Sequence, residues 1–302
     1  MHIYLPVAAV TMDGFVLLAI GGVAGLLSGM FGIGGGILLT PLLILYGVPP
    51  AVAVASSANQ LVGASIPEAV AHWRRGQVDL AMALVMLVGG LAGSVFGVSV
   101  FAVLRSLGQD ALVVELSYAA LLALLGVTLL GESLRAGLRP GGPAPRLLHQ
   151  HKWVHGLPLK LRFHRSKLYI SLLAPLGLGF VAGSVSAVLG AGGGLIMVPA
   201  MIYLLGMPTS MVPGTALFQI VFVSAAVTVL QEVENGTVDL ALAMILLVGG
   251  TIGAPLGKII GSKLRGTPLR VALALLALAV AVELVAGMTV SPDGIYTIEA
   301  LR

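Results

Sequence analysis

The sequence predicts an all-α polytopic membrane protein made of two inverted-topology repeats, and three observations lead to this fold class. First, 58% of the 302 residues are hydrophobic and only 9% are charged, which is too few to cover a soluble domain of this length. Second, no Asp, Glu, Lys or Arg occurs between Asp13 and Glu68 or between Lys167 and Glu232. Third, the apolar runs are continuous, as in residues 80–104, which favours helices over the alternating polarity of a β-barrel strand.

The chain contains two homologous halves. Residues 25–41 (GLLSGMFGIGGGILLTP) align without a gap to residues 183–199 (GSVSAVLGAGGGLIMVP), and both stretches contain a glycine triplet. Further along, residues 76–93 align to residues 236–253, and each stretch begins with the pattern G-x-V-D. Self-similarity of this kind indicates a repeated structural unit. The predicted domains are a first transmembrane repeat, a basic linker and a second transmembrane repeat, at residues 1–131, 132–167 and 168–302.

Each half divides into five apolar segments, of which the second is short. The expected helices of the first half lie at residues 12–31, 35–46, 51–71, 79–104 and 111–131. Those of the second half lie at residues 168–189, 193–206, 210–230, 239–264 and 268–288. A helix of 12 to 14 residues spans about 18–21 Å, which is less than the roughly 30 Å hydrocarbon core of a bilayer. Each glycine triplet therefore marks a helix that begins inside the membrane.

The signs of the loop charges predict the topology. The linker is rich in Lys and Arg, so the positive-inside rule places it in the cytoplasm. The loop after the third segment contains Arg74 and Arg75 in the first half, whereas the matched loop contains Glu232, Glu234 and Asp239. Matched loops of opposite charge are expected on opposite faces, so each half crosses the membrane an odd number of times. The halves are then inverted, with both termini outside a plasma or bacterial inner membrane.

The glycine triplets and the third segments supply the candidate substrate-binding residues. A helix N-terminus carries partial positive charge and free N–H groups that bind anions, and glycine lets a ligand approach the backbone closely. Ser56 and Gln60 share one helix face, and Thr215 and Gln219 repeat this spacing at matched positions. Close helix packing and hydrogen bonds between helices are the alternative explanations. The candidates are Gly34, Gly35, Gly36, Ser56, Ser57, Asn59, Gln60, Gly192, Gly193, Gly194, Thr215 and Gln219.

Few ionisable residues lie near membrane depth, and these are functional candidates by default. Glu68 lies toward the end of the third segment and is the candidate for carrying a coupling ion, with pairing to a neighbouring arginine as the alternative. Asp79 and Asp239 open the matched fourth segments, where capping of the helix N-terminus explains them without a role in transport.

Motifs for other kinds of chemistry do not appear in the sequence. The linker histidines have no acidic or cysteine neighbour that would complete a metal site, and they are His149, His151 and His155. No Walker, H-E-x-x-H or G-x-S-x-G motif occurs. We therefore expect no enzymatic activity, no metal, no cofactor and no nucleic-acid partner. The oligomeric state, including a homo-oligomer, stays open because lipid-facing and helix-facing surfaces have similar compositions.

The string GLLSGMFGIGGGILLTPLLILYGVPPAVAVASSANQ, its second copy and the G-x-V-D pattern resemble the sulfite exporter TauE/SafE family of membrane anion permeases. The resemblance extends through both halves. It implies a transporter of small anions such as sulfite, sulfoacetate and related organosulfonates, usually by export. The glycine-rich motifs of the family fall on Gly32–Gly36 and Gly190–Gly194, where Ala191 replaces Ile33 in the second copy.

Together these features predict a secondary transporter that moves a small anion by alternating access around a site between the halves. The inside-negative membrane potential favours anion export by about 2.3 kcal/mol per charge per 100 mV, whereas uptake requires a coupled cation such as a proton or Na⁺. A passive anion channel and an uptake permease for sulfur-containing anions are the alternatives. A membrane-embedded enzyme is disfavoured because the sequence offers no catalytic cluster.

Overall fold

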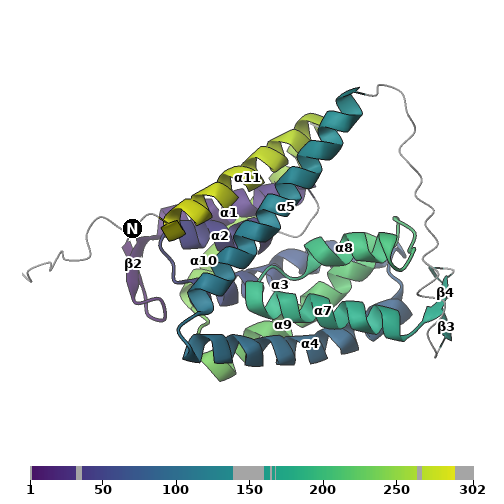
Figure 1. The fold of residues 1–302 in the computed structure, drawn as a ribbon, viewed down its shortest axis with the longest axis horizontal. Helices are drawn as coiled ribbons and strands as arrows, with labels where there is room; N and C mark the ends of the chain where they lie inside the picture. Colours follow the sequence, from purple (N-terminus) through teal and green to yellow (C-terminus); the bar gives the residue numbers. More distant parts are fainter. Residues whose placement is uncertain are drawn as a thin grey trace, which may run out of the picture.

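The computed structural model describes residues 2–31, 36–138, 160–163, 165–166, 168–263 and 267–289, and Figure 1 shows them as a bundle of helices. The helices of the first half are α1 (Gly14–Phe31), α2 (Gly36–Leu45), α3 (Pro50–Arg74), α4 (Leu80–Ser106) and α5 (Asp110–Leu138). Those of the second half are α7 (Leu173–Leu189), α8 (Gly194–Tyr203), α9 (Val212–Asn235), α10 (Leu240–Lys263) and α11 (Thr267–Thr289). All ten expected segments are therefore helical.

Each half begins with a β-hairpin that the sequence did not predict. Strand β1 (His2–Leu5) pairs antiparallel with β2 (Val10–Asp13), and β3 (Lys160–Phe163) pairs antiparallel with β4 (Leu168–Ser171). The prediction of an all-α chain was wrong at these two places, because segments rich in β-branched and aromatic residues form short strands beside the first helices. The helices expected to begin at residues 12 and 168 begin instead where these hairpins end.

The second helix of each half is short, as predicted. Both α2 and α8 have 10 residues and span about 15 Å. Between α7 and α8, the backbone of Gly190, Gly192 and Gly193 is left-handed, with φ angles of 70°, 67° and 66°. Residues with a Cβ rarely adopt this conformation, so these three glycines permit the chain to end one helix and start the next. Gly34 and Gly35 of the first half lie outside the described residues.

The first helix of each half packs along the fourth helix of the other half: α1 along α10, and α7 along α4 (Figure 1). Both seams depend on glycine, because a Cβ on Gly25 would clash with the carbonyl oxygen of Gly250, and one on Gly183 with that of Gly90. Gly25 matches Gly183 and Gly90 matches Gly250 in the sequence repeat. Contacts one turn away advance in the same direction along both helices. Each seam is therefore a parallel pair, and the two seams use equivalent residues.

The third helices, α3 and α9, pack against each other in antiparallel orientation. Trp73 at the end of α3 stacks on Phe218 near the start of α9, with ring centroids 5.7 Å apart. Near the middle of α3, Leu61 approaches Ile220 of α9 at Gly192. The fifth helices, α5 and α11, form a separate pair that leans across one side of the bundle (Figure 1).

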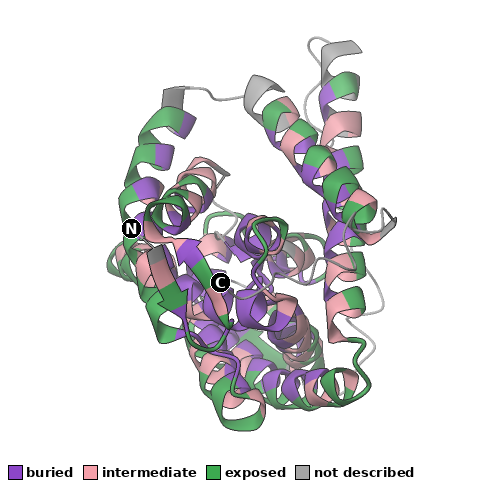
Figure 2. Cartoon of the chain, turned by 90° about the vertical axis from the view of Figure 1, so that its left-hand side faces the viewer, coloured by how far each residue is buried: buried purple, intermediate pink, exposed green. Residues whose placement is uncertain are grey.

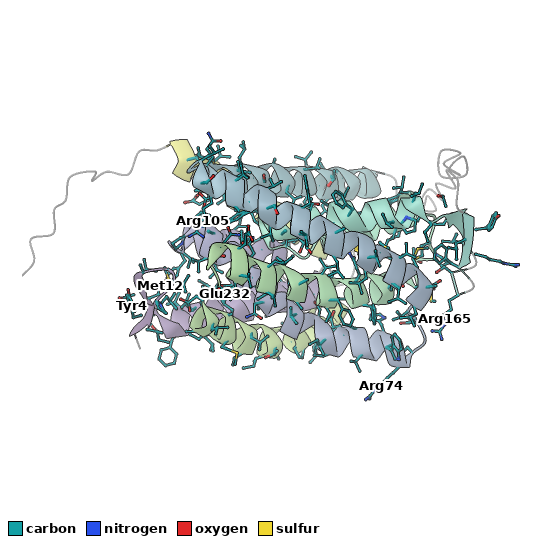
Figure 3. All side chains as sticks on the ribbon, turned by 90° about the horizontal axis from the view of Figure 1, so that it is seen from below. Tyr4, Met12, Arg74, Arg105, Arg165 and Glu232 are labelled. Carbon is teal, nitrogen blue, oxygen red and sulfur yellow. The ribbon has the colours of Figure 1, made fainter. Side chains whose placement is uncertain are left out.

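The charged residues labelled in Figure 3 lie at the two ends of the bundle. Arg74 and Arg165 lie at one end, called here the linker end, where Arg165 donates a hydrogen bond of 3.1 Å to the Val78 carbonyl. Arg105 and Glu232 lie at the opposite end, together with the N-terminal hairpin. The basic loop after α3 and the acidic loop after α9 are therefore at opposite ends of the molecule.

The outward faces of the helices are exposed and the centre of the bundle is buried (Figure 2). Large apolar side chains dominate the exposed faces, including Val88, Leu124 and Val282, which are 61%, 66% and 67% exposed. Five of the helices are long and apolar enough to cross a membrane. An apolar exterior of this extent is unfavourable in water and suits a lipid environment, so the protein is a multi-pass membrane protein.

Candidate functional site

The starts of α2 and α8 converge beside the middle of α3. A Cβ on Gly36, the first residue of α2, would lie 2.5 Å from Cδ1 of Leu61 and 3.1 Å from the carbonyl oxygen of Gly190. A Cβ on Gly192, just before α8, would lie 3.0 Å from the same Leu61 atom. The glycine-rich breaks of the two halves therefore meet around one side chain at the centre of the molecule. Gly194 is buried there as the first residue of α8.

Gln60 and Gln219 occupy equivalent buried positions next to this centre. Each amide fits against a glycine of a fourth helix, Gln60 at Gly250 and Gln219 at Gly90. Among the described residues, neither Nε2 nor Oε1 of Gln60 has a hydrogen-bond partner. Nε2 of Gln219 is 3.5 Å from the carbonyl of Met86, and its Oε1 has no partner. A buried polar atom without a partner costs roughly 1–3 kcal/mol of stability, so the whole Gln60 amide and the Oε1 of Gln219 are available to a ligand.

The hydroxyl groups of Ser56 and Ser57 add to this unpaired set. Both residues are fully buried on α3, and neither Oγ has a partner within the described part of the chain. Ser186 of α7 and Ser224 of α9 are in the same condition, although the sequence prediction did not include them. The available signal was that both have serine counterparts in the first half. Asn59 differs because it is partly exposed.

Thr215 lies at the linker end, one turn from Gln219. Its hydroxyl donates to the Met211 carbonyl at 2.8 Å and accepts from the backbone N–H of Asp79 at 3.1 Å. Thr215 and Gln219 are four residues apart on α9 and share one helix face, as predicted from the sequence. The Thr215 hydroxyl, unlike the Gln219 Oε1, already joins the start of α9 to the start of α4.

Asp79 and Asp239 cap α4 and α10, as the sequence predicted, and each also binds a hairpin. Oδ1 of Asp79 accepts from the N–H of Met82, while Oδ2 accepts from the backbone N–H and hydroxyl of Ser166 at 2.9 and 2.6 Å. Asp239 caps the start of α10 in the same way and accepts from the N–H of Val7 at 3.2 Å. Asp79 of α4 therefore holds the β3–β4 hairpin that precedes α7, the helix that packs along α4. Asp239 of α10 likewise holds the β1–β2 hairpin that precedes α1, the helix that packs along α10.

The remaining candidates lie away from the centre or outside the described residues. Glu68 lies on α3 between Gln60 and the linker end and is partly exposed. The linker histidines, His149, His151 and His155, are outside the described residues. Within the part of the chain that the structure describes, no group of three His, Asp or Glu side chains could hold a metal ion.

Two helix breaks beside buried unpaired amides and hydroxyls, enclosed by apolar helices, are features that membrane transporters share. Residues 17–284 match the family described as sulfite exporter TauE/SafE. The chain belongs to this family of membrane transporters and is not an enzyme, which confirms the resemblance carried by the glycine-rich motifs.

Three similar bacterial proteins agree with this assignment. A probable membrane transporter protein of Xylella fastidiosa (strain Temecula1) is 29% identical over 254 residues, covering 83% of this chain and 86% of the relative. The probable membrane transporter protein YunE of Bacillus subtilis (strain 168) is 25% identical over 263 residues, covering 84% and 90%. YjnA of the same organism, also a probable membrane transporter protein, is 26% identical over 267 residues, covering 86% and 95%. No solved structure matches the chain significantly.

Proposed function

We propose that the protein is a secondary transporter that exports a small anion, sulfite or an organosulfonate such as sulfoacetate, by alternating access. The observation that carries this proposal is the unpaired, fully buried amide of Gln60, on the residue next to Leu61, at whose side chain the starts of α2 and α8 converge. A polar group without a partner at this depth is costly, and a substrate that hydrogen-bonds to it offsets the cost.

The chemistry of this centre suits an anion. The first N–H groups of α2 and α8 have no partners within their own helices and carry the positive ends of the helix dipoles. The Gln60 amide and the hydroxyls of Ser56 and Ser57 add further donors. The described residues at the centre include no carboxylate that would repel an anion, and no ammonium or guanidinium that would hold it tightly. Binding through neutral donors favours reversible release.

An inverted relationship between the halves accounts for the packing. α3 and α9 are equivalent helices of the two halves, and they pack in antiparallel orientation. A two-fold axis that exchanges two antiparallel helices must be perpendicular to both. The axis then lies in the membrane plane, as in many secondary transporters. The basic linker end, with Arg74 and Arg165, is proposed to face the cytoplasm, and the N-terminal hairpin the outside. Residues 1–131 and 168–302 serve in this proposal as the two repeats.

Two helix pairs are suited to move as units during alternating access. The glycine seams of α1 with α10 and of α4 with α7 bring backbone against backbone, whereas the centre between them contains unpaired polar groups. Rocking of one pair against the other around this centre would expose the substrate to each side in turn. Glu68, between the centre and the linker end, is the proposed proton carrier in the uptake mode.

The test is transport by purified protein in proteoliposomes. Saturable uptake of radiolabelled sulfite or sulfoacetate, accelerated by the same anion inside the vesicle, is expected for a carrier. Flux that rises linearly without such counterflow indicates a channel, and absence of flux for both anions contradicts the proposed substrate class.

Gln60→Leu tests the site itself. A hydrogen bond to a charged partner contributes about 1.5–3 kcal/mol, so the KM is expected to rise about 10- to 150-fold. The thermal stability of the variant should not fall, because the amide has no partner in the structure. Gln109→Leu, at an exposed position, is the matched control and should transport normally. This substitution is sharper than one at Gly193, whose left-handed φ of 66° makes any side chain strained.

A further inference from the structure

Side chains from three other helices cap the carbonyl groups at the end of α7. The Ala187 carbonyl accepts a hydrogen bond of 2.9 Å from Nε2 of Gln231 on α9. The Leu189 carbonyl accepts from the hydroxyl of Tyr118 on α5 and from Oγ1 of Thr40 on α2, the latter at 3.4 Å. Gln231, Tyr118 and Thr40 are all fully buried. We call these three side chains the carbonyl cap.

The position of this cap matters because two helix ends of opposite polarity lie close together. The last carbonyls of a helix have no partners in their own helix and carry a partial negative charge. Leu189 ends α7, and α8 begins only five residues later at Gly194. An anion at the start of α8 would therefore lie close to carbonyl oxygens that repel it. Ala187 and Leu189 are buried, so in this structure their carbonyl groups depend on protein donors rather than on water.

We infer that Tyr118, Thr40 and Gln231 are positioning residues that set the preference of the centre for anions. Their donors hold the α7 carbonyls in hydrogen bonds, which reduces the negative field at the start of α8 and fixes the left-handed glycine turn. This inference rests on the proposed anion site. The proposed anion site consists of the glycine-rich breaks and the polar residues of α3 and α9, and the carbonyl cap adds Tyr118, Thr40 and Gln231 to it.

The cap also makes the two helix breaks different. Thr40 is matched by Val198 in the second half, which has no hydroxyl to donate. Tyr118 packs in an apolar cluster of α2, α5, α7 and α11 residues, so its hydroxyl projects from otherwise apolar surroundings onto the Leu189 carbonyl. Tyr118→Phe therefore removes one donor and keeps the ring that fills this cluster.

The experiment compares transport of two anions of different charge by Tyr118→Phe in proteoliposomes. Loss of one hydrogen bond is expected to raise the KM for sulfoacetate, with two negative charges, about tenfold. The KM for methanesulfonate, with one charge, should rise only about threefold, because the repulsion scales with the charge of the ligand. The maximal rate per folded protein should change less than either KM. Thr40→Val should show the same ordering with a smaller effect, since its hydrogen bond is longer.

Two controls remove comparable groups elsewhere. Tyr169→Phe acts on β4, where the ring is 58% exposed, and Thr128→Val removes a hydroxyl that bonds within its own helix to Leu124 at 2.8 Å. Both should leave the two KM values unchanged. Equal rises for both anions in Tyr118→Phe and Thr40→Val, or no rise, would overturn the inference alone. Failure of the unmodified protein to transport any of the anions would overturn the proposed function, and this inference with it.

Discussion

The seam between α4 and α7 and the centre between α3 and α9 are both buried, yet they use polar groups in opposite ways. In the seam, glycines bring backbones together, and Ser184 donates a hydrogen bond of 3.0 Å to the carbonyl of Gly93. At the centre, Gln60, Ser56 and Ser57 retain unpaired polar atoms. The seam is therefore arranged for stability, whereas the centre retains hydrogen-bonding capacity at a cost in stability. Substitutions in the two regions should separate stability from transport.

The largest expected effect comes from breaking the seam with Gly183→Leu. A side chain on Gly183 would clash with the backbone carbonyl of Gly90, which cannot move aside as a flexible side chain could. We expect a loss of about 3 kcal/mol, at the upper end of typical overpacking costs, measured by thermal unfolding of the protein in detergent. At Gly177 on the same helix, an exposed position, an added Cβ meets no atom within 4 Å, so Gly177→Leu should not destabilise the protein and should gain up to about 1 kcal/mol from helix propensity. Similar melting temperatures for the two variants would contradict the packing of this seam.

The same contrast explains which parts of the fold could be predicted from the sequence. The ten helices and the two breaks follow from local signals, namely continuous apolar runs and the glycine triplets that end at Gly36 and Gly194. The packing of each first helix against the fourth helix of the other half could not be predicted, because nothing in the sequence around Gly25 and Gly183 distinguishes them from the other glycines in apolar segments. Their partners, Gly250 and Gly90, are far away in the sequence. The four-residue strands of the hairpins were too short to distinguish from the helices that follow them.

At the candidate site, the sequence repeat was the useful signal, whereas the position of each residue across the membrane could not be predicted. Gln60 and Gln219 were predicted as a pair and lie at equivalent buried positions. Thr215 shares the face of Gln219 but contacts the loop at Asp79, because a helical pattern gives direction around the axis and not the position of the membrane. Tyr118 was missed, since its contact with the Leu189 carbonyl depends on tertiary structure alone.

An intermediate loss of stability is expected when the aspartates that bind the two hairpins, Asp79 and Asp239, are replaced. Asp79→Ala removes a helix cap worth about 1 kcal/mol and leaves the buried Ser166 N–H and hydroxyl without their acceptor, which costs about 1 kcal/mol or more. Asp239→Ala removes a cap that accepts from the N–H groups of Ala241 and Leu242 and one hairpin hydrogen bond, from Val7. Val7 is exposed, so water can replace the lost acceptor there, whereas Ser166 is buried. Thermal unfolding should therefore show a loss of about 2 kcal/mol for Asp79→Ala and a smaller loss for Asp239→Ala. Equal losses would mean that the Ser166 contacts do not stabilise the linker end.

The smallest effect, and the finest test of the seam, compares two glycines two residues apart on α7. Gly177 is exposed and has open space around its Cβ position, so Gly177→Ala should stabilise the protein by up to about 1 kcal/mol through helix propensity. Gly179→Ala gains the same propensity but directs its methyl group at the carbonyl of Met86, so the net change should be destabilising. Stability changes of opposite sign for the two variants would show that only the Gly179 face of α7 packs against α4. Stabilisation by both substitutions would show that α4 and α7 are not in backbone contact.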